Sequence, residues 1–378
     1  MYYVMHLNRI EEDILGGESG PVKQKAMEVL VALGNIYGAE KLVPIESAQI
    51  AGVSYKTIGD AGLEYLTDLT GNVVVPTMLN PMGMDRHKWQ QMGIEEDFVE
   101  KQLAIIARYE SLGIDSQCTC TPYYVSAPQK KAHLSWSESS AVSYANSVIG
   151  ARTNREGGPS ALAAALIGKT PEYGYHLDEN RIPNVSVKVD FPLAGADFGA
   201  LGNVVGKILN SGVPQFSFAS PPSDDELKAL GAGMAASGSV ALFYAQKVSK
   251  CRESLELEYT DVDIYSPSEP DVVVLGCPHC SRSELVQIEQ LLRGRTVKRP
   301  LWICVSRFVA NRCGSLISRI EATGAQVICD TCMIVSPTFE NLNMMVNSGK
   351  ALEYGPTMCN SLASIETTQG CIDTACNA

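Results

Sequence analysis

Cysteines are the residues of this chain whose type and spacing most clearly indicate chemistry. The sequence has 378 residues and 12 cysteines. No secretory signal precedes them, because Glu11, Glu12 and Asp13 stand where an apolar run would be needed. A cytosolic protein keeps its thiols reduced, so clustered cysteines favour a metal, an iron–sulfur cluster or catalysis over disulfides. The densest segments are Cys118-Thr119-Cys120, Cys277-Pro278-His279-Cys280 and Cys329-Asp330-Thr331-Cys332.

The spacing of these cysteines leaves four interpretations open. Two Cys-x-x-Cys pairs are present, Cys277/Cys280 and Cys329/Cys332. They could form a tetrahedral zinc site, or either pair could act as a thioredoxin-like dithiol. Alternatively, three cysteines from separate loops could hold an iron–sulfur cluster. The plainest interpretation is that most of them fill core space, since a free cysteine behaves as a small buried hydrophobe. We expect this last role for Cys251, Cys304 and Cys313.

Three other segments carry polar residues that suit a binding site. Residues 135–140 should cap a helix, but the Trp and Glu among so many hydroxyls also suit substrate contact. Arg152 and Arg155 lie in a glycine-rich turn, where bidentate bonds could hold a carboxylate or a phosphate. A solvated loop would have the same composition. Lys350 lies among small residues, which suits an anion contact, although a surface lysine is the commoner case.

Alternating strands and helices must position these segments. Apolar periodicity predicts helices at 21–36, 98–111, 139–149 and 159–167, and strands just before Gly52 and at 72–76. In the C-terminal third it predicts strands at 271–275, 300–305 and 325–328 and helices at 283–292 and 308–322. This order indicates parallel sheets with right-handed crossovers, whose ligands bind at the carboxyl ends of strands. Cys277 and the segment 329–332 should therefore lie at one sheet edge.

Length and charge limit the class of protein. A chain of 378 residues exceeds one ordinary core. We expect an N-terminal α/β region at 1–180 with the Cys120 and substrate loops, a middle α/β region at 181–265, and a C-terminal α/β domain at 266–378 with Cys332. A net charge of -12 argues against a general nucleic-acid binder. No stretch approaches the roughly 20 apolar residues of a membrane span, so we expect a cytoplasmic protein.

Taken together, the polar segments resemble the aconitase X family, a branch of the aconitase superfamily of dehydratases. The resemblance implies several parallel-sheet α/β domains of aconitase type packed around a central cleft. The matching segments run in order over nearly the whole chain: Gly52-Val53-Ser54, Asn80-Pro81, Thr119-Cys120-Thr121-Pro122-Tyr123, Glu138-Ser139-Ser140-Ala141, residues 146–154, Pro278-His279-Cys280-Ser281, Asp330-Thr331-Cys332 and Asn347-Ser348-Gly349-Lys350.

What the resemblance implies is a hydro-lyase with a [4Fe-4S] cluster. Archaeal members with two subunits convert (R)-5-phosphomevalonate to trans-anhydromevalonate 5-phosphate and water, in the mevalonate pathway of isoprene biosynthesis. This chain begins directly at the large part, so it looks like a large subunit whose partner is a separate small, swivelling subunit. Its substrate would be a phosphorylated hydroxy acid. The alternative on the same scaffold is cis-3-hydroxy-L-proline dehydratase, and a zinc-stabilised, non-catalytic binding subunit is the alternative from another class.

The resemblance also implies residue roles. Cys120 and Cys332 are expected as cluster ligands, with Cys371 preferred over Cys277 as the third. Three ligands leave one iron open to act as a Lewis acid on a substrate hydroxyl. The base is expected to be a serine of the small subunit, so this chain alone should be inactive. The substrate contacts carried over are Gly52, Val53, Ser54, Asn80, Pro81, Glu138, Ser139 and Lys350, with Arg152 and Asn154 as additions.

Overall fold

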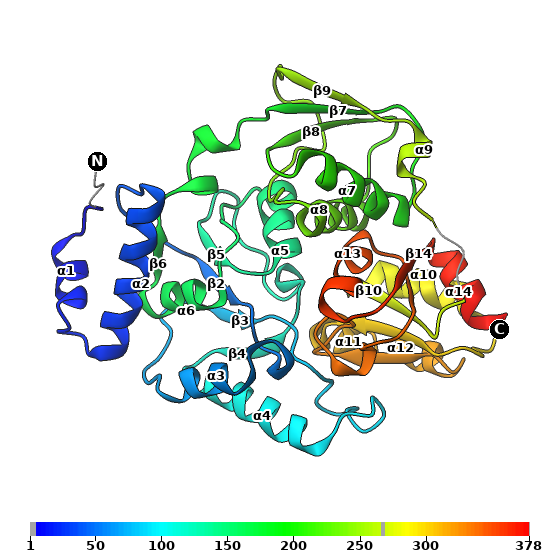
Figure 1. Ribbon diagram of the computed structural model, residues 1–378, viewed down its shortest axis with the longest axis horizontal. Helices are drawn as coiled ribbons and strands as arrows, with labels where there is room; N and C mark the ends of the chain where they lie inside the picture. Colours follow the sequence, from blue (N-terminus) through cyan, green and yellow to red (C-terminus); the bar gives the residue numbers. More distant parts are fainter. Residues whose placement is uncertain (1–4, 266–268, 378) are drawn as a thin grey trace.

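The N-terminal region contains a four-stranded parallel sheet in the order β4-β3-β2-β5 (Figure 1). The computed structural model describes residues 5–265 and 269–377. The strands are β2 (Ser47–Ile50), β3 (Thr77–Leu79), β4 (Asp115–Cys118) and β5 (Leu134–Trp136). The helices are α1 (Arg9–Leu15), α2 (Pro21–Tyr37), α3 (Tyr55–Thr67), α4 (Glu96–Ser111), α5 (Ser139–Tyr144) and α6 (Gly158–Ile167). A short antiparallel pair, β1 (Leu42–Pro44) with β6 (Lys169–Pro171), lies beside α2.

The middle region forms a three-stranded parallel sheet in the order β8-β7-β9. Its elements are β7 (Val185–Val189), α7 (Ala196–Leu209), β8 (Pro214–Phe218), α8 (Asp224–Ser237), β9 (Glu253–Glu256) and α9 (Tyr259–Val262). Helix α8 packs against α7 and also against helices of the two other regions, α5 and α13 (Gly349–Met358). The middle region therefore contacts both of the others through one helix.

The C-terminal region is a five-stranded parallel sheet in the order β12-β11-β10-β13-β14. The strands are β10 (Val272–Cys280), β11 (Leu301–Val305), β12 (Gln326–Cys329), β13 (Met344–Val346) and β14 (Ala363–Ile365). The remaining helices are α10 (Arg282–Leu292), α11 (Arg307–Arg312), α12 (Gly314–Glu321) and α14 (Thr368–Cys376). Helix α10 packs against both α12 and α14, and the chain ends beside α14 (Figure 1).

One core joins the N-terminal and C-terminal regions. Alternate residues of a strand point to opposite faces of a sheet. On β10, Val273 and Leu275 belong to the apolar cluster formed with α10 and α14. Val272 and Val274 instead belong to the large cluster that contains Met27 and most of the N-terminal core. The two sheets are therefore held in one fixed relation by burial of apolar surface between them.

The fold class is confirmed, and most of the predicted elements are observed. Helix α2 begins at Pro21 and ends before Gly38, which is left-handed at φ 70°. The strand predicted at 72–76 is wrong: pairing begins only at Thr77, after Pro76, which has no N–H to donate. The helix predicted at 308–322 is two helices, α11 and α12, separated by Cys313. The segment 139–149 is helical throughout, with α5 passing into a π-helical turn at Ala145–Ile149.

The division into three domains stays a proposal. The predicted limit at 266 falls on residues 266–268, which lie outside the described part of the chain. Among the described helices, none combines the length and the apolar composition needed to cross a bilayer.

Candidate active site

The carboxyl ends of the N-terminal and C-terminal sheets open on the same cavity, of about 360 Å³. We call it the site cavity. Its walls are Ala51, Asn80, Pro81, Cys120, Ser137, Glu138, Ser139 and Arg155 from the N-terminal region and Cys277, Cys332, Ile334, Val335, Lys350, Tyr354 and Met358 from the C-terminal region. Each N-terminal strand from β2 to β5 leads into this wall, and so do β10, β12 and β13. Ligand sites of parallel sheets are found at such edges.

Three cysteines from three separate segments line the site cavity. Cys120 is 4% exposed, and Cys277 and Cys332 are each 7% exposed. Burial raises the pKa of each thiol, in the case of Cys277 to about 12, while the charge of Lys350 opposes the rise. A thiol in such a place is protonated until a metal displaces the proton. These cysteines are therefore poor free nucleophiles and suitable ligands.

The structure does not bring Cys371 to the site cavity. It lies on α14 in the apolar cluster shared with α10 and β10, and its thiol donates to the carbonyl of Glu366 at 3.8 Å. Cys277, the alternative weighed against it, lies in the cavity wall with Cys120 and Cys332. The reason is that α14 covers one face of the sheet, whereas Cys277 stands where β10 reaches the carboxyl edge.

Lys350 and Glu138 form a buried ion pair inside the site cavity. Burial opposes ionisation of Glu138, but the charge and hydrogen bond of Lys350, with a 2.8 Å bond from Asn80 Nδ2, lower its pKa to about 2. Burial likewise opposes the charge of Lys350, and Glu138 nevertheless raises the pKa of Lys350 above its usual value. Lys350 Nζ also donates to Ser140 Oγ at 3.3 Å. Both groups are thus charged around neutral pH. Asn80 Oδ1 is buried without a partner among the described residues.

Arg155 enters the site cavity, whereas Arg152 and Asn154 do not line it. Arg155 donates to the carbonyl of Ala235 at 3.0 Å and to the Tyr354 hydroxyl at 3.1 Å, two partners without charge. Arg152 pairs with Asp178 and donates to the carbonyl of His176 at 2.6 Å. The Asn154 amide donates to the carbonyl of Tyr173 at 3.1 Å. Of the two arginines in the glycine-rich turn, only Arg155 can meet a ligand in the cavity.

The predicted segment Gly52-Val53-Ser54 lies behind the cavity wall. Ala51, the residue before it, lines the cavity, and the Ser54 hydroxyl donates to the carbonyl of Val335 at 2.8 Å. Gly158 makes this packing possible, because a Cβ there would stand 2.4 Å from the Ala51 carbonyl oxygen. Helix α6 therefore abuts the end of β2.

Several wall residues were missed from the sequence. Tyr354 and Met358 follow Lys350 at intervals of four on α13, so helical spacing could have indicated both. No comparable signal indicates Ile334 or Val335, whereas Ser137 belongs to the segment 135–140 that the sequence indicated.

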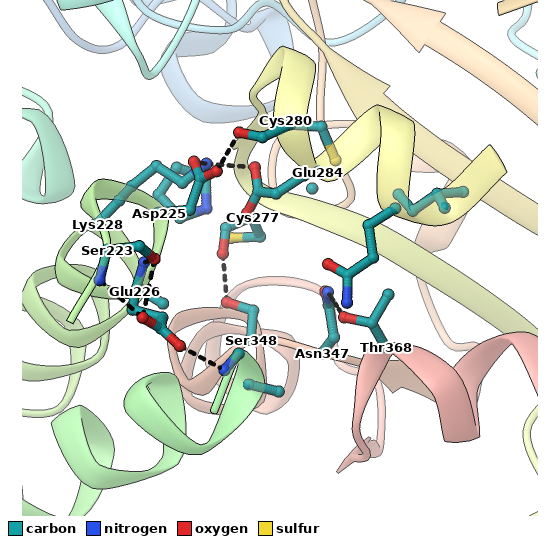
Figure 2. Close-up of a pocket in the computed structure, with 18 of the residues that line it drawn as sticks. Ser223, Asp225, Glu226, Lys228, Cys277, Cys280, Glu284, Asn347, Ser348 and Thr368 are labelled. Carbon is teal, nitrogen blue, oxygen red and sulfur yellow. Dashed lines mark hydrogen bonds and ion pairs between the residues drawn. The ribbon is translucent and has the colours of Figure 1, made fainter. Parts of the chain in front are cut away.

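Cys277 also lines a second cavity, of about 330 Å³ (Figure 2). We call it the side cavity. Three of its charged groups pair with one another: Lys228 of α8 forms ion pairs with Asp225, at 3.3 Å, and with Glu284 of α10. Figure 2 shows these three beside Cys277 and Cys280. Because Cys120 and Cys332 line the site cavity but not the side cavity, we take the site cavity as the candidate active site.

The donor set of the site cavity fits an iron–sulfur cluster, whose usual ligands in proteins are cysteine thiolates. Within residues 5–265 and 269–377, no three His, Cys, Asp or Glu side chains converge on one ion position. A cluster binds each thiolate through a different iron. Its ligands need only border a common space, as Cys120, Cys277 and Cys332 do.

Sequence comparison decides the family. Family models match the chain in succession: "Aconitase X first domain" at residues 4–179, "Aconitase X second domain" at 183–266 and "Aconitase X third domain" at 270–377. The chain belongs to the aconitase X family. A crystal structure of aconitase X from Thermococcus kodakaraensis, in its holo-form, matches this aconitase X chain with a TM-score of 0.90 and 42% identity. The match covers 98% of this chain and 100% of the other.

Curated relatives of this aconitase X chain are named dehydratases, which confirms the predicted enzyme class, a hydro-lyase. The phosphomevalonate dehydratase large subunit of Methanosarcina mazei is 52% identical over 98% of this chain and 97% of its own length. The corresponding subunit of Methanothermobacter thermautotrophicus is 48% identical over 94% and 95%. Cis-3-hydroxy-L-proline dehydratase of Pseudomonas aeruginosa is 31% identical over 98% of this chain but 70% of its own length.

Proposed function

We propose that this chain is the large, catalytic subunit of a phosphomevalonate dehydratase. It would convert (R)-5-phosphomevalonate to trans-anhydromevalonate 5-phosphate and water. The observation that carries the proposal is the single cavity where three thiols, the Lys350–Glu138 pair and Arg155 meet. The relatives support this substrate, because the large subunits are more similar and match nearly end to end.

Cys120, Cys277 and Cys332 would hold a [4Fe-4S] cluster. When bound, such a cluster with three protein ligands supplies an open iron that acts as a Lewis acid on the departing hydroxyl. All three cysteines are buried, so the protein would shield the cluster ligands from bulk water. Cys277 replaces Cys371 in this proposal because of its place in the cavity wall.

The charged residues of the cavity would bind and orient the substrate, which carries a carboxylate and a phosphate. Arg155 offers a planar guanidinium whose present partners are uncharged, so it can bind an oxyanion without first breaking an ion pair. Lys350 has three N–H donors, of which Glu138 and Ser140 engage two. Asn80 presents an unpartnered amide oxygen that can accept from a substrate hydroxyl. Among the residues predicted as substrate contacts, Asn80, Pro81, Glu138, Ser139 and Lys350 border this space.

A base must take the proton from the carbon next to the departing hydroxyl. We assign that role to a serine of a small subunit, as the resemblance to the family implies. The relatives named "large subunit" support a partner of this kind. The chain alone would then bind substrate but not turn it over.

Anaerobic co-expression with the small subunit, followed by assays on both candidate substrates, tests the proposal. We expect turnover of phosphomevalonate by the pair and none by either chain alone. Turnover of cis-3-hydroxy-L-proline but not of phosphomevalonate would favour the alternative enzyme. Metal analysis separates the remaining alternative: zinc without inorganic sulfide would indicate a non-catalytic binding subunit.

A further inference from the structure

His279 contacts all three segments that carry the site-cavity thiols. It lies on β10, two residues after Cys277, and its side chain is fully buried. The backbone N–H of His279 donates to Cys120 Sγ at 3.1 Å. The main chain of this residue therefore links the Cys277 and Cys120 segments directly.

The imidazole of His279 adds the link to the Cys332 segment. Nε2 lies 2.9 Å from the carbonyl oxygen of Thr331, and because a carbonyl only accepts, Nε2 carries the proton. In that tautomer Nδ1 accepts from the Thr119 hydroxyl, at 3.2 Å. Thr119 directly precedes Cys120, and Thr331 directly precedes Cys332. One ring thus spans two segments that are far apart in the sequence.

The backbone around His279 is also held from the side cavity. Lys228 Nζ lies 3.5 Å from the carbonyl oxygen of His279, and the Ser348 hydroxyl donates to the carbonyl of Cys277. Lys228 and Ser348 line the side cavity together with Cys277 (Figure 2). Both ends of the segment 277–279 therefore form hydrogen bonds with neighbouring helices or their caps. These bonds restrict the position of the imidazole.

We propose that His279 is a positioning residue that holds the three thiol-bearing segments at the spacing a bound iron–sulfur cluster requires. The inference rests on the proposed function, because it takes Cys120, Cys277 and Cys332 as the ligands. His279 is not a ligand itself, since Thr119 and Thr331 engage both ring nitrogens. Groups that orient metal ligands typically change metal affinity about 10- to 100-fold when they are removed.

Iron loss from the reconstituted complex of this chain with its small subunit tests the proposal. The complex is challenged with an iron chelator under anaerobic conditions, and the visible absorption of the cluster is followed. His279→Phe keeps a ring but loses both hydrogen bonds, so iron loss should be about 10- to 100-fold faster than in the wild type. His279→Gln keeps one donor and one acceptor. Its rate of iron loss should therefore fall between those of the wild type and His279→Phe.

His176→Phe is the matched control. His176 is also buried, at 1% exposed, but its ring contacts His133 at 2.9 Å and no thiol-bearing segment. We expect its iron loss to match the wild type. If His279→Phe does not accumulate folded, Thr119→Val removes one ring contact while keeping the imidazole, and it should also accelerate iron loss.

Two outcomes with the variants overturn the inference. One is iron loss at the wild-type rate in His279→Phe or, where that variant does not fold, in Thr119→Val. The other is equal acceleration by His176→Phe, which would indicate general destabilisation. A wild-type complex that binds no iron and sulfide would overturn the proposed function and this inference with it. A wild-type cluster that the variants retain equally well would overturn this inference alone.

Discussion

Lys350 and Glu138 form an ion pair inside the site cavity although 212 residues separate them in the sequence. Lys350 stands at the start of α13 in the C-terminal region, and Glu138 caps α5 in the N-terminal region. The pair therefore joins the two sheet edges that form the cavity. Both charges are buried, so each depends on the other to remain ionised.

Breaking this pair should cost stability, and removing both charges should restore it. Glu138→Gln leaves Lys350 as an uncompensated buried charge, for which losses of about 3–5 kcal/mol are typical. The double variant Glu138→Gln with Lys350→Met removes that penalty, so its Tm should recover most of the loss. Turnover should stay absent in both variants, because both lack the Glu138 carboxylate of the site cavity. Thermal unfolding of the chain and assays of the complex measure the two effects, and a Tm that stays low in the double variant would contradict the assignment.

Acid should weaken the folded chain through Glu138. Its folded pKa is lowered from 4.5 to about 2, so its stabilising contribution is present above about pH 4.5 and is lost as pH falls toward 2. The shift corresponds to a contribution on the order of 3 kcal/mol. The Tm of the wild type should therefore fall relative to the double variant between about pH 5 and pH 3. Parallel curves for the two proteins would contradict this prediction.

Alanine variants of four cysteines should separate the ligands from core residues. Cys120→Ala, Cys277→Ala and Cys332→Ala should each lose most of the iron and sulfide after anaerobic reconstitution. Cys371→Ala should keep both, because its thiol lies in the apolar cluster beside α10. Iron and sulfide analysis gives the result. Loss of the cluster in Cys371→Ala with retention in Cys277→Ala would reinstate the assignment first expected from the sequence.

Arg155 should contribute to substrate affinity, and Arg152 should not. Hydrogen bonds to charged groups contribute about 1.5–3 kcal/mol, so Arg155→Met should raise KM for phosphomevalonate about 10- to 100-fold with a smaller change in kcat. Arg152→Met is the matched control, since Arg152 pairs with Asp178 away from the cavity. Steady-state kinetics of the two variants measure KM and kcat for phosphomevalonate and so compare the contributions of Arg155 and Arg152. Equal effects on KM would indicate that the whole turn, not Arg155, is what matters.

Much of the site could be predicted because its residues follow strands of recognisable period. A short apolar run predicts β12, and Cys332 follows this strand in a polar segment. The place of Cys332 at a sheet edge can therefore be predicted from the local sequence. Asn80 and Glu138 likewise follow strands, β3 and β5, but periodicity did not predict either strand at its observed position. The strand predicted at 72–76 failed for a related reason: its three valines have strand propensity, but pairing partners exist only for Thr77–Leu79.

The choice between neighbouring candidates could not be predicted in this way. Arg152 and Arg155 share one glycine-rich turn, and the packing of that turn against α8 and α13 selects Arg155. Cys277 and Cys371 are both buried cysteines of the C-terminal region. They differ in whether they face the carboxyl edge of the sheet or its helix-covered face.

The sequence by itself determined the family, the parallel α/β architecture and most of the segments that reach the site. The family follows from the resemblance of short motifs in a fixed order, and the architecture follows from apolar periodicity, which is local. Only the tertiary structure decided that Cys277 joins Cys120 and Cys332, that Lys350 pairs with Glu138, and that His279 lies between the three thiol-bearing segments. Those relations depend on how two sheets pack through a shared core, and burial of apolar surface is not directional enough to be read from one segment at a time.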